Sequence, residues 1–286
     1  MAIKIKRKIN RSFGGTFSIW VFLVICASVM LLPLVYAIST ALKPMDEFFL
    51  FPPKFFAENP TFQNFRTLFS IFDNSEVPLT RYLFNTIFVS LFGTAGQVVL
   101  ASACAYALAK LHFPCRNIMF KIIVASLMFN STITGVANFL IFRTLGMVDT
   151  YWAVIIPSFA SPMGLYLMKQ FVEQMIPDTL LEAGRIDGAG EIYMFVKLAL
   201  PLVKPAWLTL IVFAFQALWN SGATAYVYNE KLKTINYALS QIAAGGIARS
   251  GAAAAGTVIM MIVPMIVFVI TQSNILETMA TSGMKD

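Results

Sequence analysis

The sequence predicts an all-α membrane protein with six transmembrane helices, and three observations lead to this prediction. Hydrophobic residues make up 58% of the 286 residues and charged residues only 12%, and the mean hydropathy is +0.74. A soluble domain carries about 25% charged residues. The hydrophobic residues form long continuous runs rather than an alternating pattern, which favours helices. Basic residues gather before the first run, as they do on the cytoplasmic side of a bilayer.

Six hydrophobic runs approach the length that a helix needs to cross the hydrocarbon core, which is roughly 20 residues. We expect transmembrane spans at 12–42, 82–109, 122–142, 150–172, 205–226 and 253–274. The fourth span contains Pro157 and Pro162, and a proline inside a helix removes a hydrogen bond. We therefore expect this span to be bent or interrupted.

The N-terminal segment sets the expected topology. Five basic residues precede the first span: Lys4, Lys6, Arg7, Lys8 and Arg11. Cytoplasmic segments retain such charge, so we expect the N-terminus in the cytoplasm, and six spans return the C-terminus to the same side. The run 12–42 is longer than the hydrophobic core of a signal peptide, about 7–15 residues, so it is expected to be retained. We therefore interpret the net charge of +7 as a signal of membrane topology. We expect no nucleic-acid partner.

Two outer segments carry local patterns of their own. The segment 43–81 is rich in aromatic residues and proline, which suits either an interfacial aromatic belt or a folded cap that touches another protein. We expect a short helix there, over Phe62–Phe72. A second short helix is expected from Ile235, ended by Gly245 and Gly246. The small-residue run Gly251–Gly256 allows close backbone packing where the last span begins.

Uncharged polar side chains lie at membrane depth in the predicted spans. No span carries a charge at its centre, which disfavours a proton- or sodium-coupled carrier. The amides can join helices, or they can line a path for a hydroxyl-rich solute. The candidates for such a translocation path are Asn130, Thr134, Asn138, Gln216 and Asn220.

Motifs for catalysis and nucleotide binding are absent from the sequence. No glycine is followed by lysine, so the phosphate-binding loop GxxxxGK[ST] does not occur. His112 has no acid or nucleophile beside it and is interpreted as a solvated loop residue. The cysteines Cys26, Cys104 and Cys115 lack metal-site spacing and are expected to be packing residues. We expect no catalytic residue, no metal and no cofactor on this chain, so uphill transport would take its energy from a partner.

The segment 177–201 interrupts the hydrophobic pattern between the fourth and fifth spans. It is too charged to cross a membrane and too apolar for an ordinary solvated loop. An elbow of small residues favours docking into a groove of a partner protein over lying on the membrane surface. The candidate docking residues are Leu180, Leu181, Glu182, Ala183, Gly184, Asp187 and Gly188.

The same segment has a predicted local structure. Thr179 and Glu182 fit a capping box that starts a short helix at Leu180. Gly188 suits the left-handed conformation that follows a helix C-terminus. A second amphipathic helix is expected over 191–200, after which prolines turn the chain into the fifth span.

This segment resembles the EAA motif of bacterial ATP-binding-cassette (ABC) importer permeases, which is Glu-Ala-Ala, three residues, Gly, nine residues, and Ile-x-Leu-Pro. The matching positions are Glu182, Ala183, Gly184, Gly188, Leu198, Leu200 and Pro201. Gly184 stands in place of alanine and Leu198 in place of isoleucine, and both changes keep a small or apolar character. The stretches ALKPMDEFF and ENPTFQNF and the pair Asn85-Thr86 are also similar to the smaller permease partner of carbohydrate importers.

The resemblance implies a fold, an assembly and a location. It implies a single permease domain over residues 1–286, with the type I ABC importer permease fold, in the inner or plasma membrane of a bacterium. It also implies a second homologous permease subunit, two cytoplasmic ATPase subunits that carry ATP and Mg²⁺, and an extracytoplasmic solute-binding protein. The ATPases would dock on 177–201 and drive alternating access, with membrane lipid around the spans.

Other functions are weighed against a sugar importer. A permease for amino acids or peptides would share the EAA motif, and the aromatic outer segment favours sugar over these solutes. An ATP-independent carrier would need a charge within a span, and an intramembrane enzyme would need a catalytic pair there. Neither feature occurs. The sequence does not identify which sugar is carried.

Overall fold

The computed structural model describes residues 13–129, 131–222 and 226–282. These residues form helices and connecting loops, with no strand among them, as the sequence predicts. The chain divides into two compact units. One contains the residues up to Leu68 together with Gly245–Val258, and the other contains Phe69–Ala244 and the residues from Ile259 onward.

The first unit joins a long hydrophobic helix to a folded outer loop. It contains α1 (Phe13–Leu42), η1 (Met45–Phe48) and the start of α2 (Gln63–Asp73). The buried Glu47 carboxylate accepts hydrogen bonds from the backbone N–H groups of Glu58 and Asn59. The Asn64 amide donates to the carbonyls of Ala41 and Lys43, at 2.8 and 2.7 Å. Side chains therefore satisfy the irregular backbone of this loop, and the predicted helix near Phe62–Phe72 is confirmed.

Close packing in this unit depends on a small residue. The first turns of α13 (Ile247–Ser282) place Gly251 against Asn64, and a Cβ at position 251 would lie 2.4 Å from Asn64 Oδ1. The expected tight approach at the small-residue run is therefore present. The helix before it, α12 (Ile235–Ala244), is followed by Gly246 with φ of +75°, as predicted for that helix end.

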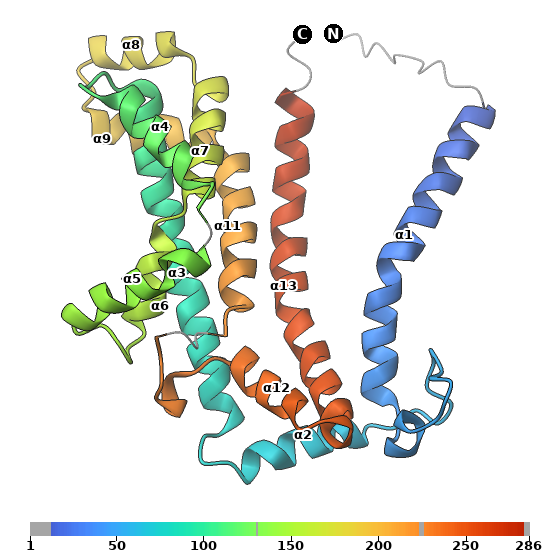
Figure 1. The fold of residues 1–286 in the computed structure, drawn as a ribbon. Coiled ribbons are helices and arrows are strands. Elements are labelled where there is room, and N and C mark those ends of the chain that lie inside the picture. The colour runs from blue at the N-terminus through green and yellow to red at the C-terminus, as the bar shows by residue number, and fades with distance from the viewer. Residues whose placement is uncertain (1–12, 130, 223–225, 283–286) are drawn as a thin grey trace. The chain divides into compact units, whose positions relative to one another are not determined.

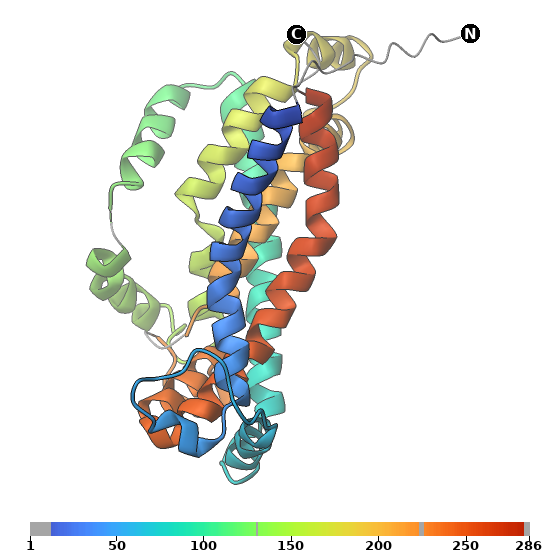
Figure 2. The same cartoon turned by 90° about the vertical axis from the view of Figure 1, so that its right-hand side faces the viewer.

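The second unit is built around α3 (Leu79–Lys110). Packed on it are α6 (Trp152–Phe159), α7 (Pro162–Met175) and α11 (Lys204–Trp219), and both views show α3, α7 and α11 running side by side (Figure 1 and Figure 2). Gly93 and Gly96 let α11 and α6 pack closely against α3. A Cβ on Gly96 would lie 2.0 Å from the ring of Phe159, and one on Gly93 would lie 2.5 Å from Leu218.

Two of the expected spans are interrupted. The region 150–172 divides into α6 and α7 at Ala160–Ser161, next to the two prolines, which confirms the predicted break. The region 122–142 was expected to be one helix. This prediction is wrong, because α4 (Arg116–Ser126) ends in turns before α5 (Ser131–Thr144) begins. The N–H groups of Met128 and Phe129 donate to the carbonyls three residues before them, Ala125 and Ser126, so the chain leaves the α-helical hydrogen-bond pattern here.

Fewer helices of the structure are long and apolar enough to cross a membrane than the six spans that the sequence predicts. Three described helices qualify, Gly15–Leu42, Leu79–Lys110 and Ile247–Gln272, and a bent pair, Glu191–Leu202 with Lys204–Trp219, would make four. Helix α11 has 16 residues, about 24 Å of helix, which is short of a typical hydrocarbon core of about 30 Å. Six crossings therefore remain a prediction.

One end of α3 is fixed by buried polar side chains. Asn85 is fully buried, and its amide donates to the carbonyls of Lys231 and Lys233 while accepting from the Tyr151 hydroxyl. The neighbouring Thr86 hydroxyl accepts from the N–H of Ile235, the first residue of α12. These bonds attach η3 (Glu230–Leu232) and α12 to α3, and explain structurally why an Asn-Thr pair lies at this position.

We predict that Asn85→Leu strongly destabilises the protein. The substitution leaves two carbonyls and a tyrosine hydroxyl unsatisfied in a buried site, which costs about 3 kcal/mol or more. The melting temperature in detergent should fall by on the order of 10 °C. The matched control is Asn74→Leu, because Asn74 lies in the exposed turn after α2 and its amide donates to the Ser70 carbonyl of that helix. Equal melting temperatures for the two variants would contradict this account.

Candidate functional site

The segment between α7 and α11 folds into a helical elbow at one end of the α3–α7–α11 bundle (Figure 1). It consists of α8 (Asp178–Ile186), a turn, and a second helical run made of α9 (Glu191–Tyr193), the π-helical η2 (Met194–Ala199) and α10 (Leu200–Leu202). The second run meets α11 at a bend of 80°. We call residues 177–202 the elbow.

The start of the elbow differs from the prediction. Helix α8 begins at Asp178 rather than Leu180, with Pro177 as the N-cap and no side-chain cap hydrogen bond. The expected capping box of Thr179 and Glu182 is therefore wrong, and both side chains are exposed. The physical reason is that Asp178 already places a carboxylate in the first turn, where it suits the helix dipole.

The turn of the elbow has the predicted geometry. Gly188 has φ of +78° and open space around it, a conformation that side chains with a Cβ rarely adopt. The N–H groups of Asp187, Gly188 and Ala189 donate to carbonyls of the last turn of α8. The turn therefore ends α8 with satisfied carbonyls and reverses the chain.

Two polar contacts attach the elbow to α3. At its start, the Asp178 carboxylate pairs with the Lys110 ammonium at 2.8 Å. Past the turn, Glu191 accepts from the Tyr106 hydroxyl at 3.1 Å and pairs with the Arg185 guanidinium at 2.9 Å. Lys110 and Tyr106 lie one helical turn apart on α3, so one face of that helix holds both arms of the elbow.

These contacts also set the protonation of the elbow. The hydrogen bond from Lys110, together with its charge, lowers the pKa of Asp178. The hydrogen bond to Glu191 raises the pKa of Arg185. Lys110 has only 6% of its side chain exposed, whereas Asp178 has 77%. The pair therefore neutralises a buried charge from the solvent side.

A hydrophobic core lies beneath the elbow. Leu181 and Met194 are buried with residues of α3 and α7, among them Val172. The two arms touch closely, because a Cβ on Gly184 would lie 3.1 Å from the Met194 sulfur. The glycine that departs from the EAA pattern thus lets the arms approach. Leu181 was expected on the docking surface, and this expectation is wrong because the side chain is only 2% exposed and anchors α8 instead.

The outer face of the elbow exposes hydrophobic side chains. Ile186 is 86% exposed and Ile192 is 82% exposed, and Leu180, Tyr193 and Val196 extend the same kind of surface. Ala183, Asp187 and Glu182 are also exposed. Sequence reasoning did not single out Ile186, Ile192 and Tyr193 as candidates, although their apolar character beside the turn was a usable signal. Such residues on a protruding, well-anchored segment are typical of a protein-docking surface.

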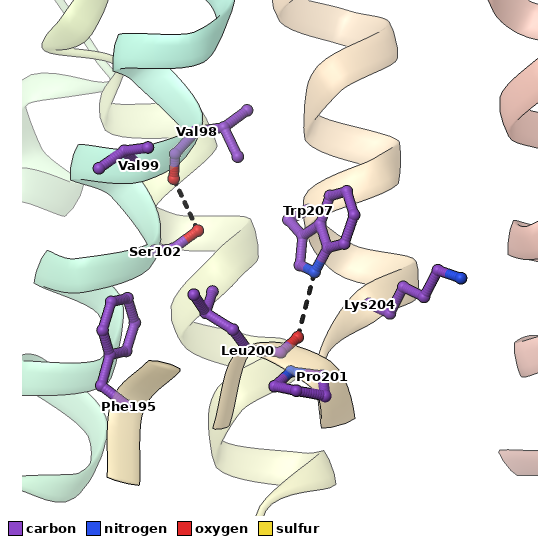
Figure 3. Close-up of a pocket in the computed structure, with 8 residues that line it drawn as sticks. All are labelled: Val98, Val99, Ser102, Phe195, Leu200, Pro201, Lys204 and Trp207. Carbon is purple, nitrogen blue, oxygen red and sulfur yellow. Dashed lines mark hydrogen bonds between the residues drawn. The ribbon is translucent and has the colours of Figure 1, made fainter. Parts of the chain in front are cut away.

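A groove of about 430 Å³ lies behind the elbow, where it bends into α11 (Figure 3). Phe195 and Pro201 contribute apolar walls, and the Trp207 indole donates to the Leu200 carbonyl at 3.1 Å, within the bend. This bond satisfies a carbonyl that would otherwise be free at a helix end. The indole thus stabilises the 80° bend.

The candidate translocation residues do not form one cluster in the structure. Asn130 lies outside the described residues, and Thr134 and Asn138 belong to α5, with Asn138 half-buried. Gln216 and Asn220 are exposed on α11, where the Asn220 amide donates to the Gln216 carbonyl. Helices α5 and α11 are not among the closely packed helix pairs of the described residues. Their role in a solute path remains a prediction.

Curated proteins with related sequences include permeases of solute transport systems. The chain is 31% identical to LplC of Bacillus subtilis over 77% of this chain and 72% of LplC. It is 30% identical to the polygalacturonan/rhamnogalacturonan transport system permease YtcP of the same organism, over 77% of this chain and 73% of YtcP. It is also 30% identical to the trehalose transport system permease SugB of Mycobacterium tuberculosis, over 88% and 91% of the two chains.

Solved structures show the same fold. A chain of a bacterial ABC transporter that imports the acidic polysaccharide alginate superposes with a TM-score of 0.75 at 23% identity, over 90% of this chain and 95% of that one. A chain of an alginate transporter in complex with its pentasaccharide-bound periplasmic protein gives 0.58 at 17% identity, over 88% and 92%. No protein-family model matches the chain. Fold and relatives together establish that this chain belongs to the permease subunits of carbohydrate ABC importers.

Proposed function

We propose that the chain is one of two permease subunits of an ATP-driven importer of a sugar or oligosaccharide, and that the elbow is where an ATPase subunit docks. One observation carries this proposal. The elbow exposes Ile186 and Ile192 almost fully, yet it is held to α3 by a buried ammonium and a tyrosine hydroxyl. A surface used only for lipid contact would have no need of such rigid attachment.

The attachment suggests how force reaches the membrane. A partner that moves α8 also moves Asp178, and the Lys110 pair passes that displacement to the end of α3. The Tyr106–Glu191 bond does the same for the second arm. Because α3 packs against α6, α7 and α11, one helix conveys the movement to the rest of the second unit. ATP and Mg²⁺ belong to the partner ATPase in this scheme.

The proposed assembly contains a second homologous permease, two cytoplasmic ATPases and an extracytoplasmic binding protein. Six crossings with both termini on the elbow side remain our proposal, and the cluster of basic residues before α1 supports it. The alginate transporter is described with a periplasmic protein that holds its sugar, which supports a binding protein here. We place the chain in the bacterial plasma membrane as a multi-pass protein.

Carbohydrate is the proposed solute class. Among the relatives named for their solutes are permeases for polygalacturonan and rhamnogalacturonan, for trehalose and for sulfoquinovosyl glycerol, and others are named for sn-glycerol-3-phosphate. We predict that uptake of labelled sugar into proteoliposomes needs ATP, the second permease, the ATPase and the binding protein together. Uptake by this chain alone would refute the proposal, and so would uptake that continues without ATP.

The turn of the elbow gives a sharper test. We predict that Gly188→Val reduces ATP-dependent uptake about tenfold or more, because a β-branched residue is strained at φ of +78° and the strain displaces α8. The variant should still assemble with the second permease. Gly188→Asn is the matched control, since asparagine tolerates the left-handed region, and it should retain most of the uptake. Equal uptake by the two variants would contradict the assigned role.

The Lys110–Asp178 pair gives a directional prediction. Asp178→Leu leaves a buried ammonium without its partner, whereas Lys110→Met leaves only an exposed carboxylate. Asp178→Leu should therefore lower the melting temperature by about 5 °C, and Lys110→Met by less. Both should weaken the coupling of ATP hydrolysis to uptake. A larger melting shift for Lys110→Met would refute this account.

The same pair predicts a pH dependence. The pKa of Asp178 is lowered in the folded protein, so the pair contributes its full stability above the ordinary aspartate pKa, about 4. The contribution is lost as the pH falls through the lowered folded-state value. The melting temperature of wild type should thus fall toward that of Asp178→Leu as the pH is lowered, and a difference between the two that grows in acid would contradict the sign of the effect.

A further inference from the structure

A cavity of about 700 Å³ lies where α6 ends and α7 begins. Its walls come from four helices of the second unit, α3, α6, α7 and α11. Gln97 lines it from the middle of α3, residues 157–158 and 160–164 from around the α6–α7 break, and Phe213 from α11. The volume falls within the range of small-molecule sites, about 300–1,000 Å³. None of the described residues that line it is charged.

Gln97 is the notable polar group of this cavity. It is only 8% exposed, and its amide makes no hydrogen bond to another described residue. Its Nε2 atom would lie 3.2 Å from a Cβ on Gly164, so the amide reaches the first turn of α7 because residue 164 is a glycine. Neither amide atom is among the fully enclosed unpartnered atoms of the described residues, so the amide is open to the cavity, where water or a ligand can supply its hydrogen bonds.

The helix break places further polar groups beside Gln97. Ser161 is the N-cap of α7, and its hydroxyl oxygen accepts from the Gly164 N–H at 3.1 Å. Its own proton has no acceptor among the described residues. The Ser158 hydroxyl donates to the Ile155 carbonyl, which leaves its oxygen lone pairs available. The 14-residue α7 also directs the positive end of its dipole to this place.

The wall from α11 is aromatic with amides beside it. Phe213 is 54% exposed, and its ring offers a flat apolar face to the C–H side of a sugar ring. Gln216 and Asn220 follow at intervals of three and four residues, which places them on the same face of α11. The expected path residues of this helix therefore flank the cavity, although they do not line it.

We propose that this cavity is a subsite for one sugar unit in transit, with Gln97 and Ser161 hydrogen-bonding adjacent hydroxyls and Phe213 covering the ring face. The lack of charge selects an uncharged sugar over a uronate or a phosphate ester. This inference rests on the proposed function. It adds the place in this chain where the solute is held and the chemical class of the solute.

Uptake kinetics of the complete transporter test the subsite. In proteoliposomes with all partner subunits, labelled neutral oligosaccharides and galacturonate oligosaccharides are offered separately. Gln97→Leu should raise the KM for the neutral sugar about tenfold. Gln241→Leu, a change of an exposed glutamine on α12, is the matched control and should leave KM unchanged. Preferred uptake of galacturonates would overturn the assigned solute class.

Cysteine labelling tests the location independently. In a chain whose three native cysteines are replaced by alanine, Ser161→Cys should react with a small methanethiosulfonate reagent and be protected by the transported sugar. Leu91→Cys, on an exposed face of α3 outside the cavity, should show no protection. If Gln97→Leu fails to assemble, this measurement alone decides whether the cavity holds the sugar.

The outcomes separate the two proposals. ATP-dependent uptake of neutral sugar by wild type, with an unchanged KM for Gln97→Leu and no protection of Ser161→Cys, would overturn the subsite and leave the proposed function intact. A wild-type assembly that takes up neither class of oligosaccharide would overturn the proposed function itself.

Discussion

The buried ammonium of Lys110 at the end of α3 is the constraint on which the elbow depends. A cation with 6% of its side chain exposed needs an anion, because burial of an unpaired charge is far more costly than burial of a pair. Asp178 supplies the anion from the first turn of α8, so α8 must begin where that carboxylate reaches α3. The position of the elbow thus follows from neutralising one charge, and the Tyr106–Glu191 bond then fixes its second arm.

Helix α3 combines three requirements along its length. Near its start, Asn85 and Thr86 satisfy backbone groups of the segment that contains η3 and α12. In its middle, Gly93 and Gly96 let α6 and α11 approach closely, and Gln97 faces a cavity. At its end, Lys110 holds the elbow. A displacement at the elbow can therefore act on the cavity wall through one continuous helix, which is the physical basis that alternating access needs.

The hydrophobic surface of the elbow and its buried core are separate sets of residues on the same short helices. Leu181 and Met194 face α3 and α7, whereas Ile186 and Ile192 face outward. This division lets the segment keep its shape without a partner and still offer apolar contact area to one. Gly184 lets the arms pack together, and Gly188 reverses the chain between them.

Composition and pattern alone determined the class of this protein, its all-helical character, the break at Pro157 and Pro162, and the position of the elbow. These features follow from local chemistry, because apolar runs, prolines and glycines act within a few residues of their position. Sequence could not place Leu181 in the core, join Lys110 to Asp178, or bring Gln97 to the first turn of α7. Those contacts join residues that are distant in the chain, and only the packing of α3 against α7 and the elbow decides which side chains meet.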